Sequence, residues 1–158
     1  WQLNDFKNKK TNITKGTMHI IYHDLFIKAA NREVYDAITL HKHLNNWWPL
    51  KSSGIPEIGA IYNLNFTSEY DWYGKVVKCE KDKTFYIEMT ESDENWNATT
   101  FGFDIEEIKG GVQLKFQHKN WKQCNDEFRQ SSFCWAMLLN GLKNYVEKGT
   151  IVPFEKRE

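Results

Sequence analysis

The C-terminal part of the chain constrains the fold more than any other stretch, because it reads as one long helix with a wide apolar face. At the helical repeat, its apolar side chains fall within an arc of roughly 140°. Lys143, Asn144, Glu147 and Lys148 lie opposite this arc, and Gly149 suits the C-cap. Such a helix needs a broad apolar surface to pack on. The apolar arc holds Phe128, Trp135, Leu138, Leu139, Leu142, Tyr145 and Val146.

The middle of the chain supplies such a surface in the form of β-strands. Apolar and polar side chains alternate along several short segments, and Gly110-Gly111 is a strong hairpin signal. This alternation is typical of an antiparallel sheet that is covered on one face and wet on the other. The expected strands are 60–67, 71–79, 84–91, 97–108 and 112–118.

The preceding part of the chain predicts one more strand and two short helices. Residues 19–27 alternate as a strand, and residues 30–38 are expected to form a short helix with Asn31 as its N-cap. Residues 41–48 continue as a second helical piece that Pro49 stops, and 49–59 is loop by its Pro, Ser and Gly content. The order of elements predicts a single α+β domain.

Composition excludes several classes of protein. The 158 residues suit one domain, and 21 basic residues balance 21 acidic ones, which argues against a nucleic-acid partner bound through its phosphates. Three cysteines without CxxC spacing indicate neither a disulfide framework nor a zinc site, so a cytoplasmic location is expected. No apolar run reaches the length of a membrane span. We expect a poorly ordered leader over 1–17, one domain over 18–153 and a tail over 154–158.

The stretch from His118 to Gly149 resembles the C-terminal signature of AHSA-type domains, which are named after the activator of the heat-shock protein 90 ATPase. The matching features are His118 at a strand end, Asn120-Trp121, Phe128, Cys134-Trp135, and "LKNYVEKG" with Pro153 beyond it. Upstream, "FIKAANREVYDAI", the Trp-Trp-Pro sequence and "IGAIYNLNF" are similar to the family's first strand, helix pair and second strand. The resemblance runs from about residue 18 to 153.

These domains belong to the START-like (SRPBCC, Bet v 1-like) helix-grip superfamily. The resemblance implies a curved antiparallel sheet of six or seven strands wrapped around the long helix, with two short helices after the first strand. An apolar cavity often remains between sheet and helix in such domains. The alternative is that the same rings fill the space completely. The resemblance places the cavity among Trp47, Trp48, Phe66, Trp72, Phe101, Phe103, Phe116, His118, Trp121, Phe128, Trp135, Leu138, Leu139 and Leu142.

His118 is the polar residue of most interest, because it continues the apolar register of its strand. It is either a group that orients a ligand's carbonyl or hydroxyl, or a core histidine bonded to backbone near Asn120 and Trp121. His23 has the same two interpretations. His41 and His43 project in different directions without a carboxylate or thiol nearby, so we expect them on a solvated face and expect no metal site.

Catalytic groups are harder to place. Cys134 lies in a helix interior, where a thiol is inert, and Cys124 lacks an evident orienting base. Glu88 and Asp71 are carboxylates that would serve as acid or base only if they faced inward, and the period of two places Glu88 toward solvent. We therefore expect no catalytic residue and no cofactor.

Three functions remain open. The first is non-catalytic binding of a small apolar or amphipathic molecule, lipids included. The second is a protein-interaction module related to the chaperone activators, which predicts an exposed apolar patch at Phe133, Met137 and the Trp47-Trp48 end. The third is an enzyme of the polyketide cyclase or hydrolase type. No nucleic acid or membrane span is expected, and both monomer and homodimer stay open.

Overall fold

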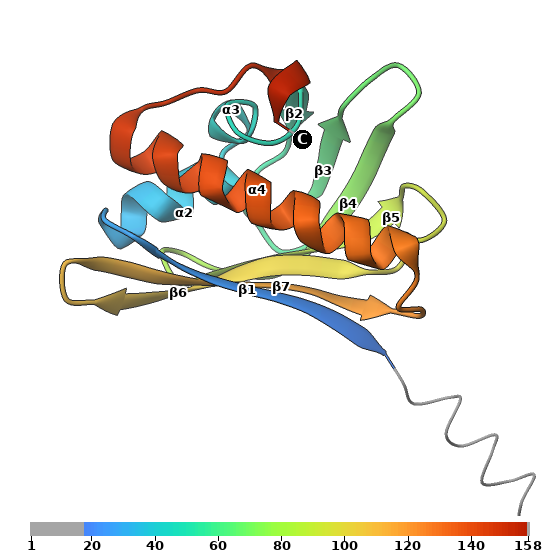
Figure 1. Ribbon diagram of the computed structural model, residues 1–158, viewed down its shortest axis with the longest axis horizontal. Coiled ribbons are helices and arrows are strands. Elements are labelled where there is room, and N and C mark those ends of the chain that lie inside the picture. The colour runs from blue at the N-terminus through green and yellow to red at the C-terminus, as the bar shows by residue number, and fades with distance from the viewer. Residues whose placement is uncertain (1–17, 158) are drawn as a thin grey trace, which may run out of the picture.

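A seven-stranded antiparallel sheet forms the larger part of the computed structural model, which describes residues 18–157. Its strand order is β1-β7-β6-β5-β4-β3-β2, so the first and last strands of the chain lie side by side. Figure 1 shows the sheet curving around the long helix α4, with β1, β6 and β7 beneath it and β3 and β4 rising beside it. The strands are β1 (His19–Ile27), β2 (Lys51–Ser53), β3 (Ile61–Asn65), β4 (Asp71–Glu80), β5 (Thr84–Glu91), β6 (Thr100–Ile108) and β7 (Gly111–Trp121).

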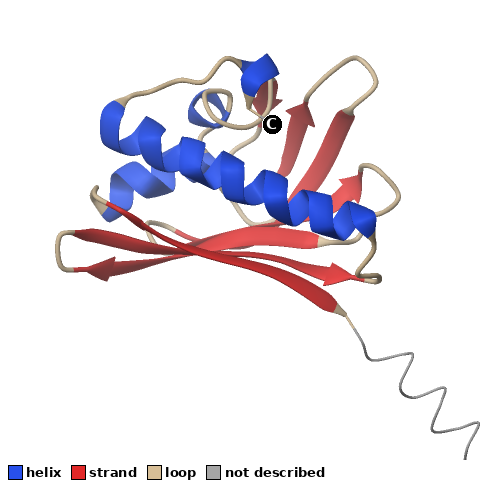
Figure 2. Ribbon diagram, in the orientation of Figure 1, coloured by secondary structure: helices blue, strands red, loops and turns tan. Residues whose placement is uncertain are grey.

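Helix α4 (Asp126–Lys148) lies across the concave face of this sheet (Figure 2). The side chain of Asn125 caps its start by accepting the Phe128 N–H at 3.0 Å, and Gly149 ends it with φ 71° in the left-handed region. Trp135, Leu139 and Leu142 are buried against the sheet, as their spacing predicts. The α+β helix-grip architecture is confirmed, with seven strands.

Lys143 and Glu147, which were expected opposite the apolar arc, are half-buried and make polar contacts at the end of β1. Lys143 Nζ donates to the Phe26 carbonyl at 2.6 Å and pairs with Glu147 Oε2 at 2.8 Å. The same carboxylate accepts the backbone N–H of Lys28 at 2.8 Å. These two side chains thus bind the end of edge strand β1 to α4. Apolar periodicity did not reveal this contact, because it is made entirely by polar groups.

The short helices α2 (Asn31–Thr39) and α3 (His41–Leu44) close one end of the fold. Asn31 is not the N-cap of α2: the helix is preceded by Ala30, which makes no side-chain capping bond. The expected loop 49–59 contains β2, in which Ser52 pairs with Leu64. A strand of three residues among Ser, Gly and Pro is too short to show a period.

The concave face of the sheet holds an aromatic core. Val112, Leu114, Phe116 and His118 alternate inward along β7 and are fully buried, as the period of two predicts. In the described residues, 18–157, no helix is long and apolar enough to cross a membrane, and no group of His, Cys, Asp or Glu is arranged to hold a metal ion. The leader expected over 1–17 lies outside these residues.

Candidate ligand-binding pocket

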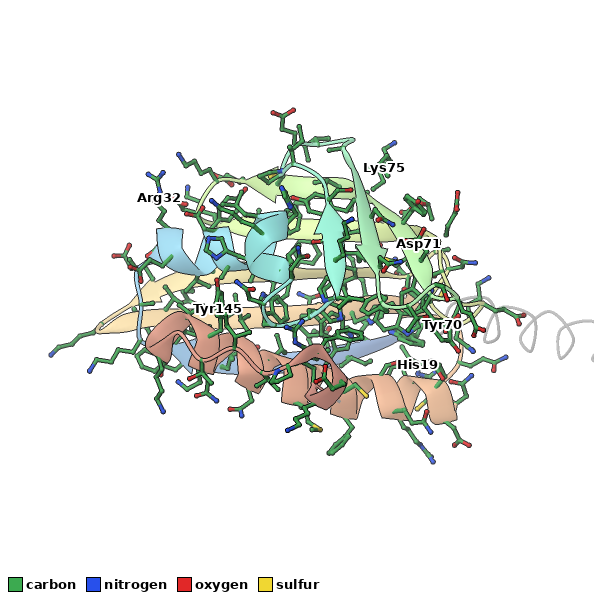
Figure 3. The ribbon with its side chains drawn as sticks, turned by 90° about the horizontal axis from the view of Figure 1, so that it is seen from above. His19, Arg32, Tyr70, Asp71, Lys75 and Tyr145 are labelled. Atoms are coloured by element: carbon green, nitrogen blue, oxygen red, sulfur yellow. The ribbon has the colours of Figure 1, made fainter. Side chains whose placement is uncertain are left out.

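A pocket of about 560 Å³ opens between α4, the β3–β4 hairpin, the β5–β6 loop and the C-terminal segment. Figure 3 shows Tyr70 at the same end of the molecule as the first turns of α4, whereas Tyr145 lies at the opposite end. The pocket therefore belongs to the N-terminal half of the long helix. Its lining residues are Trp48, Phe66, Thr67, Tyr70, Trp72, Asp93, Trp96, Glu127, Gln130, Ser131, Cys134, Leu138, Phe154, Glu155 and Arg157.

One side of α4 forms a wall of the pocket. Glu127, Gln130, Ser131, Cys134 and Leu138 all line it, and their spacing of three and four residues places them on one helix face. This face is next to the apolar arc that packs on the sheet, and Leu138 belongs to both. The wall consequently combines polar groups near the start of the helix with an apolar side chain further along.

Five aromatic side chains form a closed circuit of ring contacts, which we call the aromatic circuit. Its successive centroid distances are 5.8 Å from Trp48 to Phe66, 5.2 Å to Trp72, 5.0 Å to Trp96, 5.9 Å to Trp135 and 4.8 Å back to Trp48. Four of these rings line the pocket, whereas Trp135 is buried. Two of these contacts are edge-on, two are tilted and the one between Trp96 and Trp135 is stacked. The circuit gives the pocket a wall whose rings support one another.

His118 lies behind this wall, with both ring nitrogens bonded inside the protein. Trp135 Nε1 donates to His118 Nδ1 at 3.1 Å, and His118 Nε2 lies 2.7 Å from Thr99 Oγ1. Because an indole N–H can only donate, Nδ1 must be unprotonated, so Nε2 carries the proton and donates to Thr99. The Thr99 hydroxyl in turn donates to the Trp96 carbonyl at 2.5 Å. Burial lowers the pKa of His118 to about 3, which keeps the ring neutral.

Ser131 joins this network to the pocket. Its hydroxyl oxygen accepts the indole N–H of Trp96 at 3.2 Å, and Ser131 is itself a lining residue. Trp96 is therefore held at both ends, by Ser131 through its ring nitrogen and by Thr99 through its carbonyl. The orientation of this lining ring follows from polar groups as well as from packing.

The C-terminal segment closes one side of the pocket through the short helix η1 (Phe154–Lys156) and Arg157. Arg157 Nε donates to the Val152 carbonyl at 2.9 Å, and its Nη1 donates to the carbonyls of Pro49 at 3.0 Å and Trp48 at 3.3 Å. Partial burial lowers the pKa of Arg157 from its usual value. The segment expected to be a tail is thus bonded to the loop that follows α3.

The residues that the resemblance placed around a cavity divide into two groups. Trp48, Phe66, Trp72 and Leu138 line the pocket. The others pack in the core or against it, and the interior beneath the pocket is filled by their rings. They are Trp47, Phe101, Phe103, Phe116, His118, Trp121, Phe128, Trp135, Leu139 and Leu142.

Sequence reasoning missed several lining residues. Trp96 lies in the polar β5–β6 loop, Tyr70 in the β3–β4 hairpin, and Phe154 with Arg157 beyond α4. Loop residues carry no periodic phase, so no pattern predicts where they point. A tryptophan in an otherwise polar stretch was the one available signal for Trp96.

The other polar candidates lie elsewhere. His23 Nε2 is 3.0 Å from the Ser132 carbonyl oxygen, and its ring stacks on Phe116. His43 is not on a solvated face, because its Nδ1 lies 2.6 Å from the Tyr145 hydroxyl, whereas His41 is exposed as expected. The remaining ones named by the sequence are Glu88, Asp71 and Cys124, which are exposed, and Cys134, which is half-buried in the pocket wall.

Trp47 and Trp48 are buried rather than exposed, at 2% and 5% of their surface, which removes them from the apolar patch that a protein-interaction module predicts. Phe133 and Met137 on α4 are exposed at 67% and 40%. Only the helix part of that expected patch is therefore present.

Comparison with known proteins places the chain in a family. The family described as "Activator of Hsp90 ATPase homolog 1-like protein" matches residues 28–147. No curated protein sequence matches the chain. Among solved structures, the Aha1 dimer from Colwellia psychrerythraea, determined in solution, is similar with a TM-score of 0.77 and 28% identity. The match covers 84% of this chain and 98% of that one.

Two further structures share the fold at lower identity. The protein SSP2350 from Staphylococcus saprophyticus has a TM-score of 0.72 and 18% identity over 85% of this chain and 96% of its own. DynU16, a protein of the dynemicin biosynthetic locus, has a TM-score of 0.71 and 16% identity over 84% of this chain and 48% of its own. With the helix-grip architecture and the match over residues 28–147, the chain belongs to the Activator of Hsp90 ATPase homolog 1-like family.

Proposed function

We propose that the protein binds a small apolar or amphipathic molecule in the pocket beside α4 and does not transform it chemically. The observation that carries this proposal is the aromatic circuit, four of whose rings line a pocket of about 560 Å³. Ligand pockets of roughly 300–1,000 Å³ are typical for small molecules, and most of their lining is apolar or aromatic. Rings that served only to pack a solid core would not border an open pocket.

The expected affinity is moderate. A ligand that buries about 300 Å² of apolar surface gains roughly 7 kcal/mol, and the entropy lost on association takes back part of that gain. We therefore expect dissociation constants of about 10 μM or weaker. Partial exposure of Phe66 and Trp72 supports a pocket that is open without a large rearrangement.

A binding role is favoured over a catalytic one by the state of His118. Its ring is neutral and both nitrogens have protein partners, Trp135 and Thr99. A general acid or base needs a pKa near the working pH and a free path to the substrate, and His118 has neither. In this proposal its role is to hold Trp135, which supports the wall from behind.

The proposal is tested by filling the pocket. Cys134→Trp adds a ring to the wall of the pocket, whereas Phe133→Trp places the same indole at the neighbouring exposed position. Native mass spectrometry and calorimetric titration with a fatty acid, a sterol and a naphthalene derivative should show binding by the wild type and by Phe133→Trp. Binding should be lost in Cys134→Trp, with the fold checked by circular dichroism. Equal binding by all three proteins, or binding by none, would refute the proposal.

A second candidate function, self-association or protein binding through α4, rests on the exposed Phe133 and Met137. They lie four residues apart on one helix face, and the similar Aha1 of Colwellia psychrerythraea is described as a dimer. Light scattering of the eluting protein should then report a dimer for the wild type and a monomer for Phe133→Asp. Lys75→Gln, which changes the charge equally on the far strand β4, serves as control.

A further inference from the structure

We infer that the pocket prefers molecules whose apolar or aromatic body carries a cationic amine. This inference rests on the proposed binding function and adds the charge of the ligand to it. It follows from two features of the lining taken together: an excess of carboxylates and a corner of aromatic faces next to them.

The ionisable groups of the pocket are unequal in number. Asp93, Glu127 and Glu155 are acidic, whereas Arg157 is the one basic side chain among the described residues that line it. The chain as a whole has a formal net charge of zero, so this excess is local. A pocket with low-dielectric walls concentrates the field of such charges, and a cation is attracted to it.

The guanidinium of Arg157 already forms hydrogen bonds within the protein. Its Nε and Nη1 donate to three backbone carbonyls, those of Val152, Trp48 and Pro49, at 2.9 to 3.3 Å. These bonds fix Arg157 as a clamp between the C-terminal segment and the loop after α3. An anionic ligand that recruited this group would compete with those carbonyls for it.

Aromatic faces lie beside the carboxylates. Tyr70, Trp72 and Trp96 meet in sequence, with centroid distances of 6.4 Å and 5.0 Å and interplanar angles of 88° and 45°. Rings inclined in this way present more than one negative face to the same space, which is the arrangement that attracts an ammonium group. Each such contact contributes about 0.5–2 kcal/mol, depending on how far the cation is desolvated.

Asp93 is held close to this corner by the backbone. The carbonyl of Asp93 accepts the N–H of Trp96 at 3.0 Å and the N–H of Asn97 at 2.9 Å, so the turn that carries the carboxylate also carries the ring. Both residues line the pocket, and Asp93 is half-buried. One element thereby supplies a counter-charge and a π-face together.

The start of α4 opposes this preference, because the positive end of a helix dipole attracts anions. Asp126 and Glu127 already occupy the first turn and offset about half an elementary charge at that end. The dipole acts only within the first turn, whereas the carboxylates and rings extend across the pocket. The carboxylates and aromatic faces together therefore outweigh the helix dipole, and the pocket favours a cation.

The test uses three probes with one body: naphthylethylamine, naphthylethanol and naphthylacetate, titrated calorimetrically into the full chain at neutral pH. The amine should bind about tenfold more tightly than the alcohol, equivalent to one pair of opposite charges at partial exposure, and the carboxylate should bind most weakly. Asp93→Asn with Glu127→Gln should bring the amine down to the affinity that the same variant has for the alcohol. Glu94→Gln, an exposed neighbour outside the pocket, should leave all three affinities unchanged.

The outcomes separate this inference from the proposed function. Equal binding of amine and alcohol, or tighter binding of the carboxylate, overturns the charge preference while ligand binding stands. A Glu94→Gln effect as large as that of the double variant also overturns it, because the attraction would then come from overall charge. If none of the three probes binds, the binding function fails and this inference fails with it.

Discussion

Lowering the pH from about 8 to about 5 should destabilise the protein by about 2 kcal/mol through His118 alone. In the folded chain the pKa of this imidazole is about 3, because burial penalises its charged form, whereas its ordinary value is 6.5. Above pH 6.5 both states are neutral and the stability is fully present. As the pH falls from 6.5 toward 3, the unfolded chain binds a proton that the folded chain does not, so stability is lost.

The magnitude follows from the width of that window. Between pH 6.5 and 5 the difference amounts to 1.5 pH units, and at about 1.4 kcal/mol per unit this gives about 2 kcal/mol. Hydrogen bonding works in the same direction, because a proton on Nδ1 would face the Trp135 N–H. The rings around His118 belong to Trp96, Phe101 and Trp121, none of which titrates in this range.

The assay is urea unfolding at both pH values for the wild type and for His118→Gln. A glutamine amide can accept from Trp135 and donate to Thr99 but does not titrate, so the variant should lose about 2 kcal/mol less on acidification. His41→Gln, at an exposed histidine, should keep the wild-type loss. An equal pH dependence in the wild type and His118→Gln would refute the reasoning, since it would mean that His118 is protonated in the fold or reached by water.

Four further outcomes can be checked by unfolding or exchange measurements. Trp135→Phe removes the donor to His118 Nδ1 and should destabilise the fold by about 1–3 kcal/mol in urea, the cost of an unpaired buried acceptor. Gly141→Ala should raise stability by about 1 kcal/mol, because a Cβ there meets nothing within 4 Å and alanine is the better helix former. Gly102→Ala should lower stability instead, because its Cβ would run into the Tyr86 ring and the Phe85 carbonyl. Arg157→Gln should speed amide exchange over 150–157, whereas Lys156→Gln, whose side chain is exposed, should not.

The elements that sequence patterns predicted are those with a long, regular period. Alternation alone predicts that every second side chain of β7 from Val112 to His118 points into the core. A sheet that is covered on one face places alternate residues toward that face. The burial of Trp135, Leu139 and Leu142 follows from the helical repeat in the same way. Strand β2 and the docking of Lys143 and Glu147 on β1 have no such period, and only the fold reveals them.

The site was only partly predictable, because a pocket depends on how much space the side chains leave. Phe101, Phe116 and Trp135 point inward as expected, but they pack on one another. Trp135 lies 5.5 Å from Phe101 and 4.5 Å from Phe116 between ring centroids, and both Phe101 and Trp135 lie 6.1 Å from His118. Space remains instead where loops and the C-terminal segment meet α4. The hydrogen-bond partners of His118 could not be predicted from neighbouring sequence either, because Thr99 and Trp135 lie 19 and 17 residues away along the chain.

The tryptophans of the aromatic circuit also have an optical consequence. Trp48, Trp72, Trp96 and Trp135 are joined by ring contacts, Trp47 contacts Trp48, and Trp121 contacts Trp96, each within 6.2 Å. At such separations excitation absorbed by one indole can migrate to its neighbours. A ligand of the kind proposed that quenches a single lining ring should therefore dim the emission of the whole set.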